Sequence, residues 1–299
     1  MYVITGATGN TGSLIANRLL DAGKKVRVIG RNKEKLQPFV ARGAEAFTGD
    51  VADAAAMTRA FDGAQAVYAM IPPAMTGDYR ATQEKGSDAL AAAIAKTGVT
   101  HVVALSSVGA DKPEGTGPIA GLHSLEKKLN EIANLNLLRL RPTYFMENFL
   151  EMIPVIKQMG TLAAGNRGDL PMGMIATRDI GARAADELLK LTFTGHSTRE
   201  LLGPRDYTFS EAAGILGKAI GKPGMGYMQA PLMMVEQALM QMGMSKQMAQ
   251  LLNEMTRAMN DGTVAPREPR SAENTTPTTL EQFADEAFAP AFHGKAVSA

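Results

Sequence analysis

Short runs of apolar, β-favouring residues alternate with longer amphipathic stretches through the first half of the chain. Six runs have the composition of buried strands, at residues 2–5, 25–30, 44–50, 65–71, 101–109 (which runs into a loop) and 135–142. Helical spacing of apolar residues lies between them, at 13–22, 53–61, 82–97 and around 121–129. Strands that alternate with helices in this way predict a parallel sheet with helices on both faces.

The regular alternation ends near Thr143. The residues that follow are aromatic and amphipathic up to Leu150, and loop-forming residues dominate 160–173. Three later elements are expected: a helix at 179–191, a strand at 200–203, and a helix that Thr208–Glu211 opens as a capping box and Gly221 closes. The chain therefore changes character after its sixth strand.

This change of pattern predicts two structural parts. We expect a Rossmann-type, doubly wound α/β sheet in residues 1–150, to which 176–204 return. Residues 151–175 and 205–299 are expected to form a smaller, mainly helical substrate-binding subdomain. A length of 299 residues is enough for one large α/β domain with a smaller addition.

Residues 224–259 contain ten of the 19 methionines of the chain. Unbranched thioethers adapt to irregular shapes, so this segment is expected either to line an adaptable apolar pocket or to fill a helical core. The polar residues 261–277, with three prolines, predict a surface excursion. A second capping box at Thr278–Glu281 predicts a short final helix.

The turn between the first strand and the first helix reads Thr5-Gly-Ala-Thr-Gly-Asn-Thr-Gly12. In a dinucleotide-binding turn, the first glycine forms a tight bend, the second lets the backbone approach a pyrophosphate, and the third lets the helix pack closely on the strand. The helix N-terminus adds free amides and positive potential. An ordinary strand-to-helix turn is the alternative. The residues expected to contact the cofactor here are Gly6, Thr8, Gly9, Asn10, Thr11 and Gly12.

Arg31 follows the second strand, about twenty residues beyond the glycine turn, where this fold contacts the adenosine ribose. A basic residue there favours a 2′-phosphate, whereas an acidic one binds the 2′-hydroxyl and repels the phosphate. Lys33 and Lys35 lie close behind. We therefore expect NADP(H) to be the preferred cofactor, with Arg31 and Lys35 at the phosphate and NAD(H) as the alternative. A solvated basic turn is the structural alternative.

Two further strand ends are expected to contact the cofactor. Pro72 and Pro73 stop the fourth strand, because proline can neither donate to a ladder nor continue a helix. Ile71 and Pro72 are thereby placed at the carboxyl edge of the sheet, where ligands lie in open α/β folds, and are expected to pack against the cofactor. Ser106 and Ser107 follow the fifth strand at the same edge.

Charge and composition restrict the function. The chain is 45% hydrophobic with a formal net charge of +1, so no direct binding to nucleic acid and no attachment to an anionic membrane are expected. It contains no cysteine, which excludes a disulfide framework, a thiolate nucleophile and a cysteine metal site, and no metal is expected. The fold begins almost at Met1 and no apolar run reaches membrane-spanning length, so a cytoplasmic location is expected.

Several motifs resemble the NmrA-like group of atypical short-chain dehydrogenases. They are Thr5–Gly12, Gly121-Leu-His-Ser-Leu-Glu126 followed by Leu129, Leu140–Phe149, Arg178–Gly181 and Leu202–Pro204. The resemblance covers the whole chain. It implies an NAD(P)-binding fold and similarity to quinone reductases, dye reductases and redox-sensing regulators.

The resemblance also implies roles for individual residues. Asp50 and Val51, after the third strand, would line the adenine, although Asp50 is equally able to begin the next turn. The residues after Arg141-Pro142 would approach the nicotinamide and the substrate, with plain interdomain packing as the alternative. These substrate candidates are Thr143, Tyr144, Phe145, Met146 and Asn148.

Short-chain dehydrogenases typically place a catalytic tyrosine and a lysine four residues apart on one helix. At that helix this chain has His123 and Lys127, which share a face, and no tyrosine. A histidine that titrates near neutrality is able to act as acid or base. The resemblance therefore implies His123 and Lys127 as catalytic candidates. A structural hydrogen bond for the histidine and a solvated lysine are the alternatives.

Two functions are compatible with these features. The first is an NADPH-dependent oxidoreductase that transfers a hydride to a small, apolar, conjugated acceptor such as a quinone or dye. Such acceptors need little proton donation from the protein, which suits the missing tyrosine. The second is a non-catalytic redox sensor that binds NAD(P) and acts through a regulatory protein partner.

Overall fold

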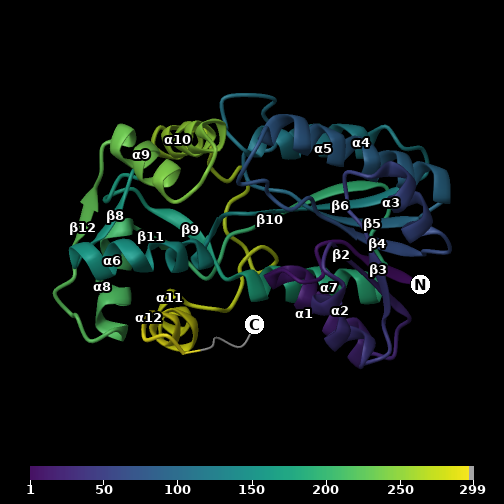
Figure 1. The fold of residues 1–299 in the computed structure, drawn as a ribbon, viewed down its shortest axis with the longest axis horizontal. Helices are drawn as coiled ribbons and strands as arrows, with labels where there is room; N and C mark the ends of the chain where they lie inside the picture. Colours follow the sequence, from purple (N-terminus) through teal and green to yellow (C-terminus); the bar gives the residue numbers. More distant parts are fainter. Residues whose placement is uncertain (296–299) are drawn as a thin grey trace.

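The computed structural model describes residues 1–295, which form a larger lobe around a central sheet and a smaller lobe beside it (Figure 1). The sheet has seven parallel strands in the order β10-β6-β5-β4-β1-β2-β3. The strands are β1 (Tyr2–Ile4), β2 (Val26–Gly30), β3 (Glu45–Thr48), β4 (Ala66–Ala69), β5 (His101–Leu105), β6 (Asn136–Pro142) and β10 (His196–Leu201). The predicted doubly wound α/β fold is confirmed.

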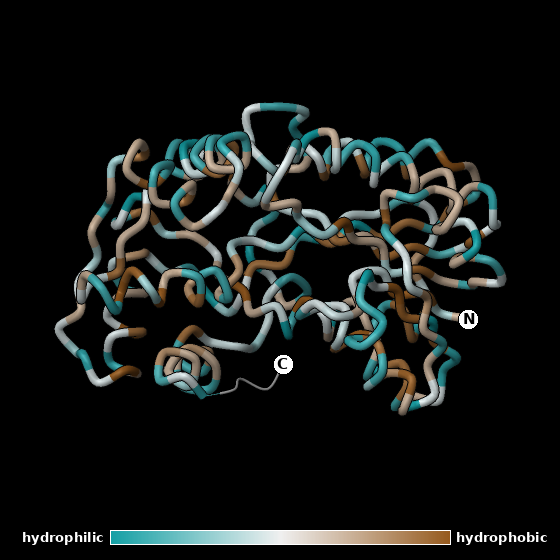
Figure 2. The backbone as a smooth tube through the Cα atoms, viewed as in Figure 1, coloured by the Kyte–Doolittle hydropathy of each residue, from teal (hydrophilic) through white to brown (hydrophobic). Residues whose placement is uncertain are grey.

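Six helices cover the two faces of this sheet: α1 (Asn10–Asp21), α2 (Lys33–Val40), α3 (Ala54–Phe61), α4 (Tyr79–Thr97), α5 (Ile119–Asn130) and α7 (Thr177–Lys190). Helices α3, α4 and α5 lie on one face, and α1, α2 and α7 lie on the other (Figure 1). Because side chains alternate along a strand, Val3 packs in one core while Tyr2 and Ile4 pack in the opposite one. The central strands are correspondingly hydrophobic (Figure 2).

The basic stretch after β2 runs into a helix that contains Lys33 and Lys35, and its basic residues are exposed. Helix α2 begins at Lys33, and the side chain of Asn32 accepts a hydrogen bond from the amide of Lys35, which caps the helix. Leu36 and Phe39 are buried against the sheet. Arg31 therefore lies between the end of β2 at Gly30 and the capping residue Asn32, at the carboxyl edge of the sheet.

The smaller lobe is mainly helical but contains two small sheets, with strand orders β11-β9-β7 and β12-β8. Its strands are β7 (Tyr144–Phe145), β8 (Leu162–Ala164), β9 (Met172–Ile175), β11 (Asp206–Tyr207) and β12 (Tyr227–Gln229). Its helices are η1 (Met146–Met152), α6 (Ile153–Met159), α8 (Phe209–Ala219), α9 (Leu232–Gln241), α10 (Lys246–Asn260), α11 (Leu280–Phe283), η2 (Ala284–Phe288) and α12 (Ala289–Phe292). A separate hydrophobic core, which includes Phe149, Phe209 and Phe288, holds this lobe together.

Several local predictions in this lobe were incomplete. The stretch 160–173 holds β8 and the start of β9 in addition to loops. Thr208 caps α8 as expected, but the carboxylate of Glu211 pairs with Arg205, so the capping box is only half formed. The last capping box lies one residue later than predicted, between Thr279 and Gln282.

Residues 261–277, which we call the crossing segment, were predicted to be a surface excursion but also tie the two lobes together. The buried carboxylate of Glu200 on β10 accepts hydrogen bonds from the amides of Arg267 and Glu268. The carbonyl oxygen of Asn274 accepts from the amide of Leu202. The segment is therefore partly exposed along its length but fixed at several backbone positions.

The methionine-rich stretch divides among three environments. Met248 is buried against α4, and Met255 and Met259 on α10 lie at a cavity described below. Met233 and Met234 on α9 are exposed, so neither expected role applies to them. Among residues 1–295, no helix combines the length and the hydrophobicity that crossing a membrane would require.

The turn from β1 into α1 depends on two glycines for different reasons. Gly6 has φ of +61°, a left-handed conformation that glycine adopts without strain. A Cβ atom on Gly12 would lie 2.3 Å from the carbonyl oxygen of Gly6. Since that contact is with backbone, no side-chain rotation relieves it, and α1 keeps its close approach to β1 only while residue 12 is glycine.

We therefore expect Gly12→Ala to lower the free energy of unfolding by about 2–3 kcal/mol, the usual cost of overpacking a tight site. Gly214→Ala is the matched control, because Gly214 lies within α8 and a Cβ atom there would meet nothing within 4 Å. The control should be neutral or stabilising, since alanine favours helix more than glycine does. Urea unfolding of both variants measures the difference, and equal stabilities would contradict the close-contact explanation.

Candidate nucleotide and substrate site

The strand order places a crevice at the carboxyl edge of the sheet. The order reverses direction between β1, which neighbours β2, and β4, which leads on to β5. In open α/β sheets, such a switch point is where ligands bind. Gly6, Arg31, Ile71 and Ser106 all lie in segments that follow strands at this edge, so the fold brings together residues that are far apart in sequence.

The first turn of α1 has the properties of an anion cradle. Among residues 1–295, the amides of Asn10, Thr11 and Gly12 donate to no protein acceptor, whereas the amide of Ser13 donates to Gly9. A Cβ atom on Gly9 would have a single protein neighbour, the carbonyl oxygen of Gly6 at 3.4 Å. The outer side of Gly9 is therefore open. Free amides beside an open backbone fit the pyrophosphate of a dinucleotide.

The threonines of this turn have different environments. The hydroxyl of Thr11 is buried and accepts a hydrogen bond of 2.9 Å from Tyr68 on β4, so Thr11 offers the cradle its backbone amide only. Thr8 is exposed. Thr5, just before the cradle, shares its hydroxyl proton between the carbonyl oxygens of Tyr68 on β4 and Met70 just after it, and accepts from the amide of Met70 at 2.8 Å. These bonds hold the turn against the switch point.

The candidates for the adenosine end lie after β2 and β3. Arg31 and Lys35 are exposed, and neither forms an ion pair with any residue in the described part of the chain. Asp50 is exposed, and its carboxylate accepts from the amide of Ala52 at 2.9 Å, which closes the turn after β3. Val51 is buried and packs in the core with Met57.

A cavity of about 410 Å³ lies between the two lobes. Its lining is mainly apolar and comes from the ends of β4, β5 and β6, from α4 and α5, and from β9, α10 and the crossing segment. The lining contains no Lys, Arg or His of the described chain, and Asp206 is its one carboxylate. The candidates that line it are Ile71, Ser106, Ser107, Thr143, Tyr144, Phe145 and Asn148.

Two candidates do not reach this cavity. Met146 is completely buried in the core of the smaller lobe and does not line the cavity. It follows Phe145 at the start of a 3₁₀ helix, which turns its side chain inward. Pro72 lies between the lining residues Ile71 and Pro73 but is not itself part of the lining.

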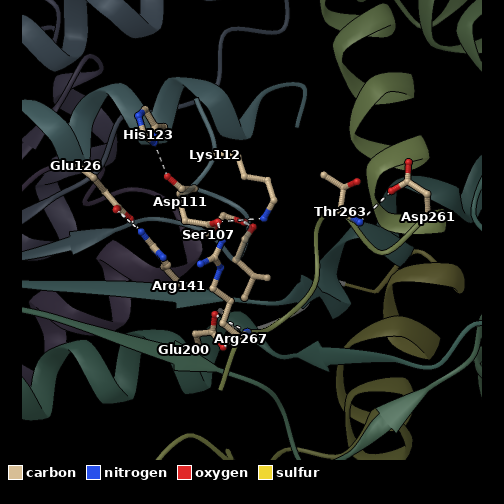
Figure 3. Close-up of polar contacts among 12 residues, drawn as sticks. Ser107, Asp111, Lys112, His123, Glu126, Arg141, Glu200, Asp261, Thr263 and Arg267 are labelled. Carbon is tan, nitrogen blue, oxygen red and sulfur yellow. Dashed lines mark hydrogen bonds and ion pairs between the residues drawn. The ribbon is translucent and has the colours of Figure 1, made fainter. Parts of the chain in front are cut away.

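Neither His123 nor Lys127 is among the residues that line the cavity. The Nδ1 atom of His123 lies 2.9 Å from the carbonyl oxygen of Ala110, so this nitrogen carries the proton and donates it to the loop after β5 (Figure 3). Lys127 is exposed on α5. The neighbour of His123 on the helix, Leu122, does line the cavity.

A buried polar network that the sequence analysis missed joins the cavity-lining Ser106 to the Glu126–Arg141 pair, which Figure 3 draws. Glu126 on α5 is 4% exposed and accepts from the hydroxyl of Ser106 at 2.5 Å. Arg141 on β6 donates to both oxygens of the same carboxylate, at 2.9 and 2.5 Å. These hydrogen bonds raise the pKa of the Arg141 guanidinium. A glutamate on the buried face of α5 was the available signal, but its partners lie 15 and 20 residues away in the sequence.

A second ionic cluster joins the loop after β5 to the crossing segment (Figure 3). Asp111 pairs with Lys112 at 3.0 Å and with Arg267. Burial opposes ionisation of Asp111, but the two cations outweigh it, and the pKa of this carboxyl is lowered. The cluster therefore favours the position in which Val264 and Pro266 close one side of the cavity.

Removing one partner of the Glu126–Arg141 pair leaves a charge that water reaches poorly. We expect Glu126→Leu to lower the free energy of unfolding by about 3–5 kcal/mol, as for other broken buried ion pairs. Glu126→Leu combined with Arg141→Met should recover most of that loss, because no unpaired charge remains. Urea unfolding of Glu126→Leu, Arg141→Met and the double variant measures the loss of unfolding free energy in each. If the loss in the double variant equals the sum of the two single losses, the pairing is refuted.

Comparison with known proteins identifies relatives that are reductases by name. The chain is 33% identical over 225 residues to a (4-alkanoyl-5-oxo-2,5-dihydrofuran-3-yl)methyl phosphate reductase of Streptomyces griseus, covering 75% of each chain. It is 27% identical over 259 residues to an NAD(P)H azoreductase of Xenophilus azovorans, covering 85% of this chain and 86% of the relative.

Solved structures have the same fold. The NADPH-dependent quinone oxidoreductase of Escherichia coli, solved with NADPH, superposes with a TM-score of 0.79 at 25% identity, covering 96% of this chain and all of that chain (100%). The triphenylmethane reductase of Citrobacter sp., complexed with NADP(H), gives a TM-score of 0.81 at 20% identity, with coverage of 96% and 100%.

A family model described as the NmrA-like family matches residues 2–284. The resemblance predicted from the sequence motifs is thereby confirmed over nearly the whole chain. The chain belongs to the NmrA-like family and has its NAD(P)-binding, Rossmann-type oxidoreductase fold.

Proposed function

We propose that this protein is an NADPH-dependent reductase that transfers a hydride to an apolar, conjugated acceptor such as a quinone or a dye. The observation that carries the proposal is the apolar cavity of about 410 Å³ at the switch point of the sheet. A volume in the range of small-molecule sites, beside a phosphate cradle, suits a dinucleotide with a second ligand. The names of the relatives, an azoreductase and a quinone oxidoreductase among them, support the same class.

The cofactor would extend along the carboxyl edge of the sheet. The amides at the start of α1 would hold its pyrophosphate, with Gly9 leaving room for the phosphate oxygens. Arg31 and Lys35 would bind the 2′-phosphate, and Asp50 and Val51 would line the adenine. Ile71 with Pro72, and Ser106 with Ser107, would lie toward the nicotinamide end. When bound, the reduced nicotinamide supplies a hydride.

The acceptor would occupy the part of the cavity that the smaller lobe covers. Thr143, Tyr144, Phe145 and Asn148 line this part from the β6–β7 region and η1. The absence of Lys and Arg from the described lining disfavours anionic acceptors, because a buried anion without a partner is strongly destabilised. Apolar walls also exclude water from the site of transfer.

The alternative role as a non-catalytic sensor has no specific observation in its favour. A sensor needs the nucleotide cradle alone, whereas the chain also has an apolar cavity that is lined from both lobes and has room for a second ligand. His123 and Lys127 receive no chemical role in this proposal, since neither lines that cavity. A regulatory partner protein is not required.

The direct test is steady-state oxidation of NADPH by purified protein with a panel of quinones, azo dyes and triarylmethane dyes. We expect turnover with at least the neutral quinones, and little with carboxylated or sulfonated analogues of the same ring system. If the protein binds NADPH but reduces no acceptor of the panel, the proposed reductase function is rejected and the sensor function remains as the explanation.

Cofactor preference is tested at Arg31. We expect Arg31→Asp to weaken NADPH binding at least tenfold, because one attraction to the 2′-phosphate is replaced by repulsion, and to change NADH binding by less than about threefold. Arg59→Asp on α3 is the control, since it makes the same charge change at an exposed position outside the proposed cofactor path. Calorimetric titration of the wild type and both variants with each nucleotide measures the losses, and equal losses of NADPH and NADH affinity in Arg31→Asp would show that Arg31 does not contact the phosphate.

A further inference from the structure

Most of the hydroxyl groups around the cavity already donate a hydrogen bond to the protein. Four of the five lining residues that carry a hydroxyl donate its proton to an acceptor within the protein. The pairs are Tyr79 with the carbonyl oxygen of Pro118 (3.1 Å), Ser106 with the carboxylate of Glu126 (2.5 Å), Ser107 with the carbonyl oxygen of Val108 (2.9 Å), and Thr143 with the carbonyl oxygen of Leu201 (3.2 Å).

These bonds determine that the four hydroxyl oxygens act as hydrogen-bond acceptors toward a ligand. A hydroxyl has one proton and two lone pairs, so a group that already donates to the protein is able only to accept from a ligand. The bond from Ser106 is the strongest of the set, because its acceptor is a carboxylate that Arg141 also holds. Ser106 is therefore unsuited to donating a proton to the carbonyl group of an acceptor.

The fifth hydroxyl belongs to Tyr144 at the start of β7. Within residues 1–295 it donates to no backbone carbonyl and to no carboxylate, and the residue is half-buried at the cavity. Its ring packs against Phe149 and Phe209, with centroid distances of 5.6 and 5.4 Å, which holds it in place. Burial raises the pKa of this hydroxyl, and contact with Asn148 offsets only part of the increase, so Tyr144 is protonated at neutral pH.

The other polar side chains of the lining are poor proton sources. Gln83 and Asn148 carry amide groups, which form hydrogen bonds but do not release protons. Asp206 is ion-paired with Arg270. No histidine, lysine or arginine of the described chain lines the cavity.

We propose that Tyr144 is the proton donor to the oxygen of a carbonyl-type acceptor, an inference that rests on the proposed reductase function. Reduction of a quinone to a hydroquinone consumes one hydride, supplied by NADPH, and one proton, so this inference replaces, for quinones, the expectation that the acceptor needs little proton donation from the protein. In this step the O–H bond of Tyr144 breaks and an O–H bond forms on the acceptor oxygen. The phenolate regains its proton from water that enters the cavity after the product leaves. A triarylmethane cation consumes a hydride alone and needs no donor.

This difference in proton demand gives the test. We expect Tyr144→Phe to lower kcat/KM for a neutral quinone about 100-fold, the usual size of a general-acid contribution. Reduction of a triarylmethane cation by the same variant should fall by a much smaller factor, because phenylalanine keeps the ring packing and that reaction takes up no proton. Equal losses for the two acceptors, or no loss for either, would overturn the proposal.

Tyr227→Phe is the matched control. Tyr227 belongs to the same aromatic cluster, with its ring 5.4 Å from that of Phe209, but it does not line the cavity. Its hydroxyl donates to the carbonyl oxygens of Ala164 and Asn166. This variant should change the quinone and triarylmethane rates by the same factor, whereas a selective loss with quinone would assign the effect to the cluster instead of to Tyr144.

An equilibrium measurement separates this inference from the proposed function. Calorimetric binding of a quinone to the protein saturated with NADP⁺ requires no turnover. Tyr144→Phe should weaken that binding about fivefold, the value of one neutral hydrogen bond, and unchanged affinity would count against donation by Tyr144. Wild-type protein that binds the quinone but never oxidises NADPH would reject the reductase, while the affinity comparison still decides whether Tyr144 donates.

Discussion

The close approach of α1 to β1 is the constraint on which the rest of the structure depends. Gly12 lies against the carbonyl oxygen of Gly6, and this contact sets both the angle of the helix and the direction of its unpaired amides. The amides point to the carboxyl edge of the sheet because the helix begins there. Thr5 then fixes the turn to β4 through three hydrogen bonds, so the cradle and the switch point form one rigid unit.

The larger lobe supplies the cradle, but the cavity needs both lobes. Strands β5 and β6 end in residues that line one side, and β9, α10 and the crossing segment provide the other. The crossing segment is irregular in structure, so its position depends on specific bonds to Glu200 and Asp111. A few buried or half-buried carboxylates thus help to hold the site between the two lobes, together with apolar contacts such as that of Met248 with Tyr79.

Sequence patterns predicted the fold well because they reflect local periodicity. Alternating strands and helices, proline stops and the glycine turn each act over a few residues, and most of the expected cavity-lining residues follow strand ends that these signals locate. The failures involve distant partners or local geometry that no motif specifies. Glu126, Ser106 and Arg141 meet only in the folded chain, and the 3₁₀ turn after Phe145 carries Met146 away from the cavity.

The seven-stranded sheet has two open borders, and their construction discourages one copy of the protein from extending the sheet of another. Strand β3, at one border, is only four residues long, and its Glu45 is held by Arg27 of the neighbouring strand. At the opposite border, β10 is followed at once by Leu202, whose amide is already used by Asn274. A second copy that paired with β3 would gain a ladder of only four residues. Pairing that continued past β10 would displace the bond between Leu202 and Asn274, and short or occupied borders are among the ways natural sheets avoid aggregation.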